Sequence, residues 1–216
     1  MSMHGRWPRE VTLVDLQIQN TQSVENAFRV IGATVTIARE PDAIADADLV
    51  VLPGVGSFAA AVAKLQEGTM QAALRRHALE WQRPILGLCL GMQLLADSSE
   101  EHGVHAGLGL IPGKVVRLQE SPPEFRVPNV GWREVSFRPG VRDVLPQSLD
   151  RRAFYHVHSF HFQTEVPEHT IAVSRFGQGD IASIVRKGNV VGTQFHPEKS
   201  QEAGLDLLHA LLQQLH

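Results

Sequence analysis

The chain has 216 residues, of which 43% are hydrophobic and 20% charged, and its formal net charge at pH 7 is −3. This composition is typical of a folded globular domain, and the slight negative charge argues against a protein that neutralises nucleic-acid phosphates. Cys89 is the only cysteine, which excludes an internal disulfide and a multi-cysteine metal site. No apolar run is long enough to span a bilayer, and the N-terminus lacks the apolar centre of a secretory signal. We therefore expect a cytoplasmic protein that binds neither nucleic acid nor membrane.

The first hundred residues alternate short apolar segments with amphipathic ones. The apolar or β-branched runs predict strands at Val11–Val14, Thr34–Ala38, Asp48–Leu52 and Pro84–Leu88. The intervening segments predict helices from Asn20 or Thr21 to Gly32, from Ser57 to Leu65, over Met70–Trp81 and over Gly91–Ala96. This alternation predicts an α/β fold, in which a central, mostly parallel sheet is flanked by helices.

The pattern changes after Gly107 to short strand candidates separated by Gly and Pro turns. These candidates are Val115–Leu118, Glu134–Phe137, Phe154–Phe162, Ile171–Phe176, Ile181–Arg186 and Val190–Phe195. We expect these additional strands of the C-terminal half to be antiparallel or mixed. A closing amphipathic helix is predicted over Gln201–Leu215. The predicted organisation is a polar extension over residues 1–10 and a single domain over residues 11–216.

The segment Gly87-Leu88-Cys89-Leu90-Gly91 places the single cysteine between a predicted strand and a predicted helix. It matches the G-x-S-x-G nucleophile elbow with cysteine in the serine position. Glycines are needed there because the turn strains the nucleophile's backbone and brings residues two positions away into collision. The alternative is a structural cysteine, since this residue type is among the most often buried. The frame by itself leaves both interpretations open.

A nucleophilic cysteine requires a base and a group that orients the base. His196 follows a predicted strand, and Glu198 shares its face because the chain is extended before Pro197. Glu198 could fix the imidazole tautomer as the acid of a triad does. The alternative is a solvated His-Pro-Glu turn.

Two further segments are ambiguous by themselves. The loop at the end of Asp48–Gly56 could present backbone N–H groups as an oxyanion hole, or it could be a plain turn; it lacks the phosphate-binding lysine motif. The His156-Val157-His158 spacing could bind zinc, although no carboxylate or cysteine lies close in sequence. A strand that contacts substrate, or a polar edge, is favoured there. No cofactor or metal site is predicted.

Taken together, these motifs resemble those of class I (triad) glutamine amidotransferases, and most of all the glutaminase subunits of imidazole glycerol phosphate synthases. The matching segments run in family order from about residue 11 to the C-terminus. They are Leu52–Phe58, Gly87–Leu95, Glu100–Gly103, Gly107–Gly113, Val127–Trp132, Val157–Ser159 and Gln194–Ser200. As a set they are highly specific.

The resemblance implies a glutaminase that sends ammonia to a (βα)8-barrel synthase subunit, as a heterodimer, in histidine biosynthesis. It implies Cys89 as nucleophile, His196 as base and Glu198 as its partner, with oxyanion donors around Val55 and at Leu90. The glutamine pocket would consist of Gly54, Gly56, Gln93, Glu101, His158, Ser159 and Phe160. The subunit interface would include Asn20, Asn129, Trp132 and Lys199.

Two departures from the family pattern concern the region that would face the synthase. Leu16–Asn20 stands where Tyr-Gly-x-Gly-Asn is common, and Arg133 stands where asparagine is usual. They leave open a paralogous glutaminase that supplies a sugar amidotransferase in surface-polysaccharide biosynthesis. A non-catalytic scaffold of the same fold is a third possibility, against which the intact Cys89, His196 and Glu198 argue.

Overall fold

The computed structural model describes residues 10–18, 21–67, 69–121, 123–141 and 145–215. Most strands of this part form one nine-stranded sheet. In chain order they are β1 (Glu10–Val14), β2 (Thr34–Ala38), β3 (Val50–Leu52), β4 (Ile85–Leu88), β8 (Asn129–Phe137), β9 (Arg152–His158), β11 (Thr170–Phe176), β12 (Gly179–Lys187) and β13 (Val190–Thr193). A smaller four-stranded sheet contains β5 (Ser98–Ser99), β6 (His105–Ala106), β7 (Gly113–Arg117) and β10 (Phe160–Thr164).

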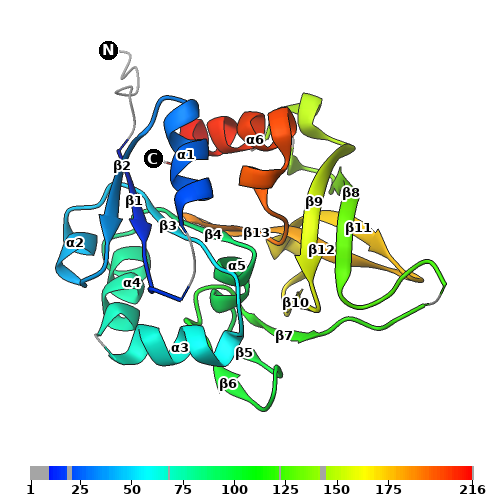
Figure 1. Cartoon of the computed structure of the whole chain (residues 1–216), viewed down its shortest axis with the longest axis horizontal. Coiled ribbons are helices and arrows are strands. Elements are labelled where there is room, and N and C mark those ends of the chain that lie inside the picture. Colours follow the sequence, from blue (N-terminus) through cyan, green and yellow to red (C-terminus); the bar gives the residue numbers. More distant parts are fainter. Residues whose placement is uncertain (1–9, 19–20, 68, 122, 142–144, 216) are drawn as a thin grey trace.

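The large sheet has a parallel half and an antiparallel half, in the order β2-β1-β3-β4-β13-β12-β11-β8-β9. The strands from β2 to β13 pair in parallel, and those from β13 to β9 pair antiparallel. This arrangement confirms the predicted α/β fold with a parallel central sheet and antiparallel strands in the C-terminal half. The antiparallel strands continue the same sheet and curve away from its parallel half, on the right of Figure 1.

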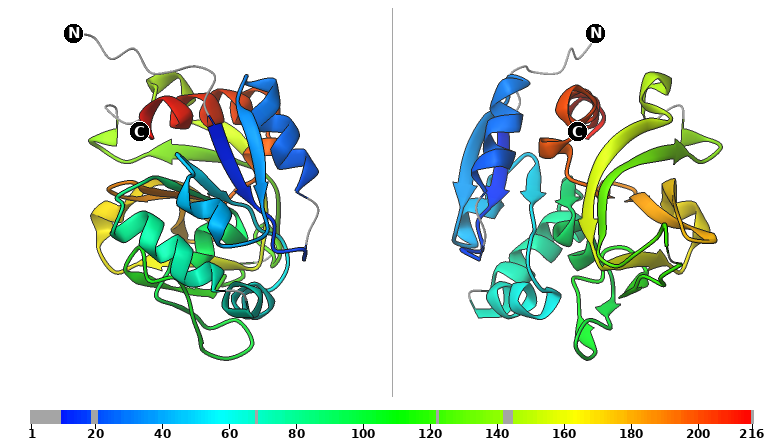
Figure 2. Two further views of the ribbon diagram at one scale, coloured as in Figure 1. Left: turned by 90° about the vertical axis from the view of Figure 1, so that its left-hand side faces the viewer. Right: turned by 45° about the vertical axis from the view of Figure 1, so that its right-hand side comes forward.

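Helices cover both faces of the parallel half. α1 (Gln22–Val30) and α6 (Gln201–Gln214) lie above the sheet in Figure 1, and α3 (Phe58–Glu67), α4 (Met70–Leu79) and α5 (Leu90–Leu94) lie below it. The short helix α2 (Asp42–Ala45) belongs to the lower layer, because its Ile44 joins the same hydrophobic cluster as α3 and α4. The turned views in Figure 2 show the same layers.

Two hydrophobic cores result from this layering, one on each face of the sheet. Along β3, Val51 points into the core under α1 and α6, and its neighbours Val50 and Leu52 point into the other. In β4, Leu86 and Ile85 divide in the same way. Because successive side chains of a strand face opposite sides, a strand covered on both faces must be apolar throughout. The continuous apolar runs of the sequence reflect this requirement.

Several predicted boundaries need correction. The single strand predicted over Phe154–Phe162 is two strands, β9 and β10, which belong to different sheets and are separated at Ser159. The strand predicted over Glu134–Phe137 begins earlier, at Asn129, where polar residues and Gly131 obscured it. The helix α2 and the two-residue strands β5 and β6 were not predicted, because such short elements leave too little periodicity to detect.

The N-terminal boundary shifts by one residue. Glu10, which was predicted to belong to the polar extension, is the first residue of β1 and pairs with Thr34 of β2. The rest of that predicted extension, residues 1–9, lies outside the described residues, so this part of the domain prediction stays a prediction. Among the described helices, none is both long and apolar enough to cross a membrane.

Candidate active site

Cys89 lies at the sharp turn between β4 and α5, as the elbow motif predicts. Its backbone angles are φ 53° and ψ −107°, a conformation that side-chain-bearing residues rarely adopt. A Cβ added to Gly87 would come within 2.6 Å of the Gly91 backbone, and one added to Gly91 would overlap the Leu52 carbonyl oxygen. The two glycines are therefore required sterically, because they let the turn fold onto the end of β3.

The neighbouring strand β13 brings the second half of the site to Cys89. Thr193 lies opposite Leu88 in the parallel register, and the Cys89 N–H donates to the Thr193 carbonyl over 2.7 Å. Gly192 lies so close to Met92 of α5 that a Cβ would come within 2.7 Å of the Met92 side chain. The chain leaving β13 therefore passes directly beside the cysteine turn.

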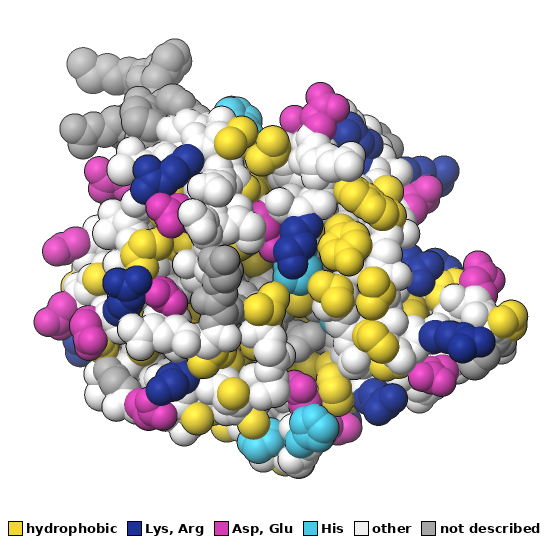
Figure 3. Space-filling view, viewed as in Figure 1, with side chains coloured by type: hydrophobic (Ala, Val, Ile, Leu, Met, Phe, Trp, Pro, Cys, Tyr) yellow, Lys and Arg dark blue, Asp and Glu magenta, His cyan; other side chains and the backbone are white. Residues whose placement is uncertain are grey.

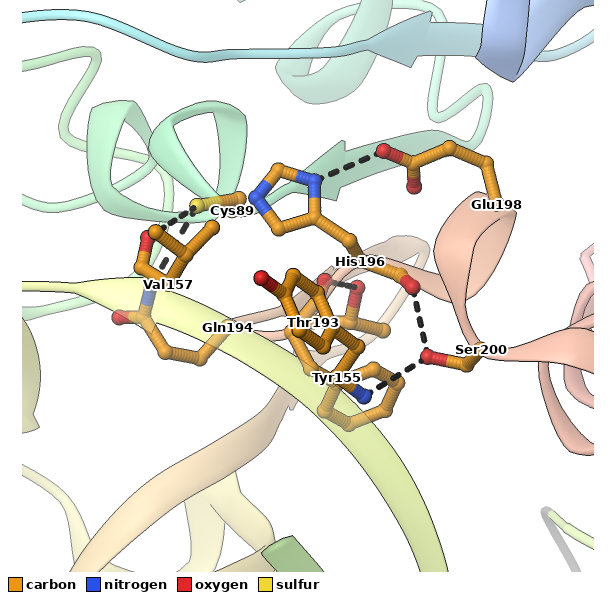
Figure 4. A network of polar contacts seen from close by, with 9 residues as sticks. Cys89, Tyr155, Val157, Thr193, Gln194, His196, Glu198 and Ser200 are labelled. Carbon is orange, nitrogen blue, oxygen red and sulfur yellow. Dashed lines mark hydrogen bonds and ion pairs between the residues drawn. The ribbon is translucent and has the colours of Figure 1, made fainter. Parts of the chain in front are cut away.

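His196 follows β13, and its ring lies between Cys89 and Glu198. The Nδ1 atom donates to Glu198 Oε1 over 2.7 Å, and both side chains are only 3% exposed. The Nε2 atom points towards Cys89, as Figure 4 shows, and has no hydrogen-bond partner within the described residues. The structure thus brings together the three residues predicted as a triad.

The charge state of His196 is set by opposing effects. Burial lowers its pKa, but the interactions with Cys89 and with the Glu198 carboxylate outweigh burial and raise the pKa to about 10. A buried imidazolium is tolerated here because two potential anions flank it, one at each ring nitrogen. The arrangement can therefore accept and hold the proton of the Cys89 thiol.

The backbone of His196 is fixed from two sides. Its N–H donates to the Tyr155 carbonyl over 2.9 Å, and its own carbonyl accepts the Ser200 hydroxyl over 2.6 Å. Ser200 Oγ in turn accepts the Tyr155 N–H over 2.9 Å, so one hydroxyl joins β9 to the start of α6 (Figure 4). Ser200 is fully buried. The His-Pro-Glu segment is consequently a rigid element and not a solvated turn.

A cavity of about 520 Å³ opens beside Cys89. Besides Cys89, it is lined by almost all residues predicted for the oxyanion hole and the glutamine pocket: Val55, Gly56, Leu90, Gln93, Glu101, His158, Ser159 and Phe160. Lys199, predicted for the interface, lines it too, as do Pro128 and Val157, which were not predicted. Gly54 lies behind this wall, where a Cβ would come within 2.5 Å of the Leu90 Cβ.

Gln194, which was not predicted as a site residue, contacts both Gln93 of this cavity and Cys89. Gln93 Nε2 donates to the Phe160 carbonyl over 2.9 Å and to Gln194 Oε1 over 3.2 Å. The amide nitrogen of Gln194, which is completely buried, lies 3.9 Å from Cys89 Sγ. Gln194 is the first residue of the segment Gln194–Ser200, which resembles the family motif and contains His196. Its place in that segment is the feature of the sequence that could have identified it as a site residue.

One predicted oxyanion donor is occupied. The Leu90 N–H donates to the Gly54 carbonyl over 3.2 Å and does not face the cavity as a free donor. The Gly54–Gly56 loop is thus pressed onto the elbow in this conformation. The Leu90 N–H can therefore serve as an oxyanion donor only if the Gly54 carbonyl moves away.

The predicted interface residues lie in different environments. Trp132 is 46% exposed and Lys199 is also exposed, as a contact surface requires. Asn129 is completely buried, and its side chain faces inward, to His158 and Arg133, so its predicted place at or near the interface stays a prediction. Asn20 lies outside the described residues.

The His-x-His segment does not form a metal site. His156 Nδ1 is bonded to the Phe154 carbonyl and His158 Nδ1 to the Phe160 carbonyl, which makes both nitrogens proton donors. Burial lowers the pKa of His156 to about 4 and that of His158 to about 3. Within the described ranges, no three His, Cys, Asp or Glu side chains converge as a metal site would need.

Comparison with known proteins adds to this geometry. The family model of class-I glutamine amidotransferases matches residues 12–212. The chain belongs to this family. Curated relatives of this amidotransferase include "Imidazole glycerol phosphate synthase subunit HisH 2" of Nitrobacter winogradskyi, which is 39% identical over 94% of this chain and 97% of the relative. The HisH subunit of Zymomonas mobilis is 40% identical over 94% of both chains, and that of Moorella thermoacetica 41% identical over 93% and 92%.

Solved structures support the fold of this amidotransferase. The structure described as PurLQS from Thermotoga maritima aligns with a TM-score of 0.71 at 18% identity, over 96% of this chain and 99% of the other. A structure described as glutamine amidotransferase aligns with a TM-score of 0.69 at 18% identity, over 92% and 98%. At this identity the likeness concerns the fold alone.

The elbow geometry predicts a steric cost at Gly91. We expect Gly91→Ala to lower the free energy of unfolding by roughly 3 kcal/mol, because the new methyl group overlaps backbone and not a movable side chain. Urea denaturation measures this value. Gly179→Ala is the matched control, since a Cβ there meets nothing within 4 Å, and it should change stability by less than about 0.5 kcal/mol. Equal effects of the two substitutions would contradict the steric argument.

The raised pKa of His196 predicts a pH-dependent contribution of Glu198. Because the folded-state pKa of about 10 exceeds the ordinary 6.5, the interactions of His196 stabilise the fold fully below pH 6.5. This contribution is lost as the pH rises towards 10. Glu198→Gln removes part of it, so the stability gap to the wild type should be largest near about pH 6 and disappear near about pH 10. Chemical denaturation across this range measures the gap. With the exposed Glu202→Gln as control, a gap that does not vary with pH would disprove the assignment.

Proposed function

We propose that this chain is the glutaminase subunit of an imidazole glycerol phosphate synthase, which hydrolyses glutamine and delivers the ammonia to a synthase subunit. The observation that carries the proposal is the Cys89–His196–Glu198 arrangement, whose cysteine lines the 520 Å³ cavity. The HisH relatives, about 40% identical over nearly the whole chain, support the histidine pathway.

In the proposed mechanism, His196 Nε2 takes the proton of the Cys89 thiol, and the sulfur attacks the side-chain amide carbon of glutamine. The carbonyl becomes a tetrahedral oxyanion. It collapses to a thioester when the C–N bond breaks, and His196 returns the proton to the leaving nitrogen, which departs as ammonia. Water, deprotonated by His196, then attacks the thioester; glutamate leaves and the thiol is restored. Glu198 keeps Nδ1 protonated and stabilises the imidazolium at each stage.

The cavity chemistry supports glutamine as the substrate. Glutamine carries an ammonium group, for which the Glu101 carboxylate supplies a counter-charge at the cavity wall. That carboxylate is held in place, since its Oε2 accepts the Phe58 N–H at the start of α3 over 2.9 Å. Gln93, Ser159 and the Phe160 backbone add neutral polar groups. We propose Glu101 as the residue that distinguishes a free amino acid from a peptide, whose nitrogen is uncharged.

The occupied Leu90 amide supports a resting state with low activity. The Gly54 carbonyl must withdraw before this N–H can bind the oxyanion together with a donor near Val55. Removing one oxyanion donor costs about 10²–10³ in rate at comparable sites. We therefore propose that movement of Gly54–Gly56, driven by the partner and its ligand, switches hydrolysis on.

The surface beside the cavity supports the proposed heterodimer. Val130 and Trp132 alternate on the outer face of β8 and are 51% and 46% exposed, and Val55 is 41% exposed. The opposing residue of Val130 is Val157, which lines the cavity. Figure 3 shows hydrophobic side chains gathered over β8 and β9 on this face. We propose that the (βα)8-barrel subunit covers this patch, so that ammonia leaves the cavity without reaching solvent.

A reducing compartment suits this chemistry. The mechanism needs Cys89 as a thiol, and oxidation to a sulfenic acid or disulfide would remove the nucleophile. Reducing conditions of this kind are those of the cytosol. We therefore propose the cytoplasm as the place where the complex works.

The mechanism predicts the effect of removing the sulfur. Cys89→Ser should lower glutamine hydrolysis by at least about 10³-fold, because an alcohol is a far weaker nucleophile here than a thiolate. Glutamate release by the complex with its barrel subunit measures this loss. Thermal unfolding of the variant serves as the control for folding. Hydrolysis that survives the substitution would rule out Cys89 as the nucleophile.

The interface predicts activation by a partner and a dependence on Trp132. Adding the barrel subunit with its ligand should raise hydrolysis by about 10²–10³, the value of one oxyanion donor. Trp132→Ala should weaken subunit binding by at least about tenfold, as a central aromatic anchor does. Trp81→Ala is the matched control, since Trp81 is 39% exposed but lies after α4, away from the cavity. Equal turnover with and without the barrel subunit would refute the proposed activation.

Genetic complementation tests the pathway itself. The gene should restore growth without histidine to an auxotroph that lacks this subunit. Failure despite good expression would favour the paralogous role in sugar amidation, which the altered loop before Asn20 first suggested.

A further inference from the structure

A chain of hydrogen bonds runs inward from Arg133 to the wall of the glutamine cavity. Arg133 Nε donates to Asn129 Oδ1 over 2.9 Å, and Asn129 Nδ2 lies 3.0 Å from His158 Nε2. His158 Nδ1 lies 2.8 Å from the Phe160 carbonyl, which also accepts Gln93 Nε2. Asn129 and His158 lie directly opposite each other on β8 and β9 and are both buried. These hydrogen bonds therefore connect β8, the strand that carries the exposed Val130 and Trp132, with three residues that line the cavity, Gln93, His158 and Phe160.

Both ends of this chain have a fixed direction. A guanidinium can only donate, so Asn129 must turn its oxygen to Arg133 and its NH₂ group to His158. A backbone carbonyl can only accept, so His158 must carry a proton on Nδ1. Nε2 then receives a hydrogen bond and has no room for a proton of its own. The neutral Nδ1–H form of His158 is the only one that satisfies every contact.

The Arg133 guanidinium is itself held in place. Its central carbon lies 5.4 Å from the centre of the Phe125 ring, in a cation–π contact, while its Nε reaches back along β8 to Asn129. Without this donor, the Asn129 amide could rotate and present its oxygen to His158 Nε2. With acceptors at both ring nitrogens, His158 would then be stabilised as an imidazolium.

We propose that Arg133 is a positioning residue, which acts through the Asn129 amide to keep His158 neutral with its proton on Nδ1. A neutral His158 keeps a second positive charge out of a cavity that must admit an ammonium-bearing substrate beside the imidazolium of His196. This consequence for turnover rests on the proposed function, whereas the orientation of the three side chains does not. Arg133, which departs from the family pattern, thus acts on the glutamine cavity through Asn129 and His158.

The surroundings of His158 agree with this role. The titratable groups that act on it are His156 on its own strand, His161 on β10 and His196 after β13; Arg133 on β8 is the nearby permanent cation. Burial, more than these neighbours, lowers the pKa of His158 to about 3. Burial alone would still permit either neutral tautomer, so the hydrogen-bond chain is what selects one of them.

The test is histidine NMR on the full-length chain, in which the ¹⁵N shifts distinguish the Nδ1–H, Nε2–H and cationic forms. The wild type should show His158 as Nδ1–H throughout the neutral range. Arg133→Met keeps the apolar stem but removes the donor, so His158 should become cationic at a higher pH than in the wild type. Asn129→Asp gives Nε2 a permanent acceptor and should produce the cation more strongly. Arg175→Met, which removes a cation paired with the surface Asp180, should change nothing.

Kinetics with the barrel subunit supply a second readout. For Arg133→Met, kcat/KM for glutamine relative to the wild type should fall progressively as the pH is lowered towards about 4, by up to roughly tenfold, the value of one hydrogen bond to a charged group, and should change by less than about twofold near about pH 8. An Nε2–H tautomer in the wild type would overturn the proposal whether or not the variants fold. If His158 in Arg133→Met became cationic at the same pH as in the wild type, the proposal would be overturned too. If the wild type hydrolyses no glutamine, the proposed function fails, and the NMR result still decides the role of Arg133.

Discussion

The close approach of α5 to the end of β3 is the contact on which the site depends. Gly91 lies against the Leu52 carbonyl with no room for a side chain, and Gly87 lies against Gly91 in the same way. Only with both side chains absent can the chain reverse within one residue, and that residue is Cys89. The strained backbone of Cys89 is held by this packing and by its N–H bond to β13. The sulfur is thereby placed at the carboxyl end of the parallel strands, where α/β sheets bind their ligands.

A second requirement is the burial of a cationic histidine. An imidazolium with 3% of its side chain exposed would be very unfavourable without anionic neighbours. Glu198 provides one at Nδ1, and the sulfur of Cys89 becomes the other once its proton has passed to Nε2. His158, which lines the cavity beside Cys89, is buried without a charge. Its Nδ1 faces an acceptor, the Phe160 carbonyl, and its Nε2 faces a donor, the Asn129 NH₂ group, so the ring stays neutral. The two histidines thus differ in charge because their hydrogen-bond partners differ, although both are buried.

The sequence predicts those parts of the structure that follow from local rules. The alternation of apolar runs and helices identifies the parallel half of the sheet, and the glycine frame around Cys89 identifies the elbow. The break at Ser159 could not be predicted, because the apolar character of Phe154–Phe162 continues across it while the strands join different sheets. The burial of Asn129 was missed for a related reason. Whether a polar residue faces a partner or the interior depends on its cross-strand neighbour, and His158 lies 29 positions further along the chain. The occupied Leu90 amide likewise depends on a loop from another strand.

The strand order has a consequence for the time at which this site comes into existence. β4 and β13 are neighbours in the sheet, yet β4 ends at Leu88 and β13 begins only at Val190, shortly before His196. During synthesis from the N-terminus, Cys89 leaves the ribosome long before its base does, and before the strand that will lie beside β4. The unfinished chain thus carries a thiol with neither His196 nor Glu198 beside it. The site can therefore become chemically competent only after β13, which lies between β4 and β12, and the residues that follow it have been made.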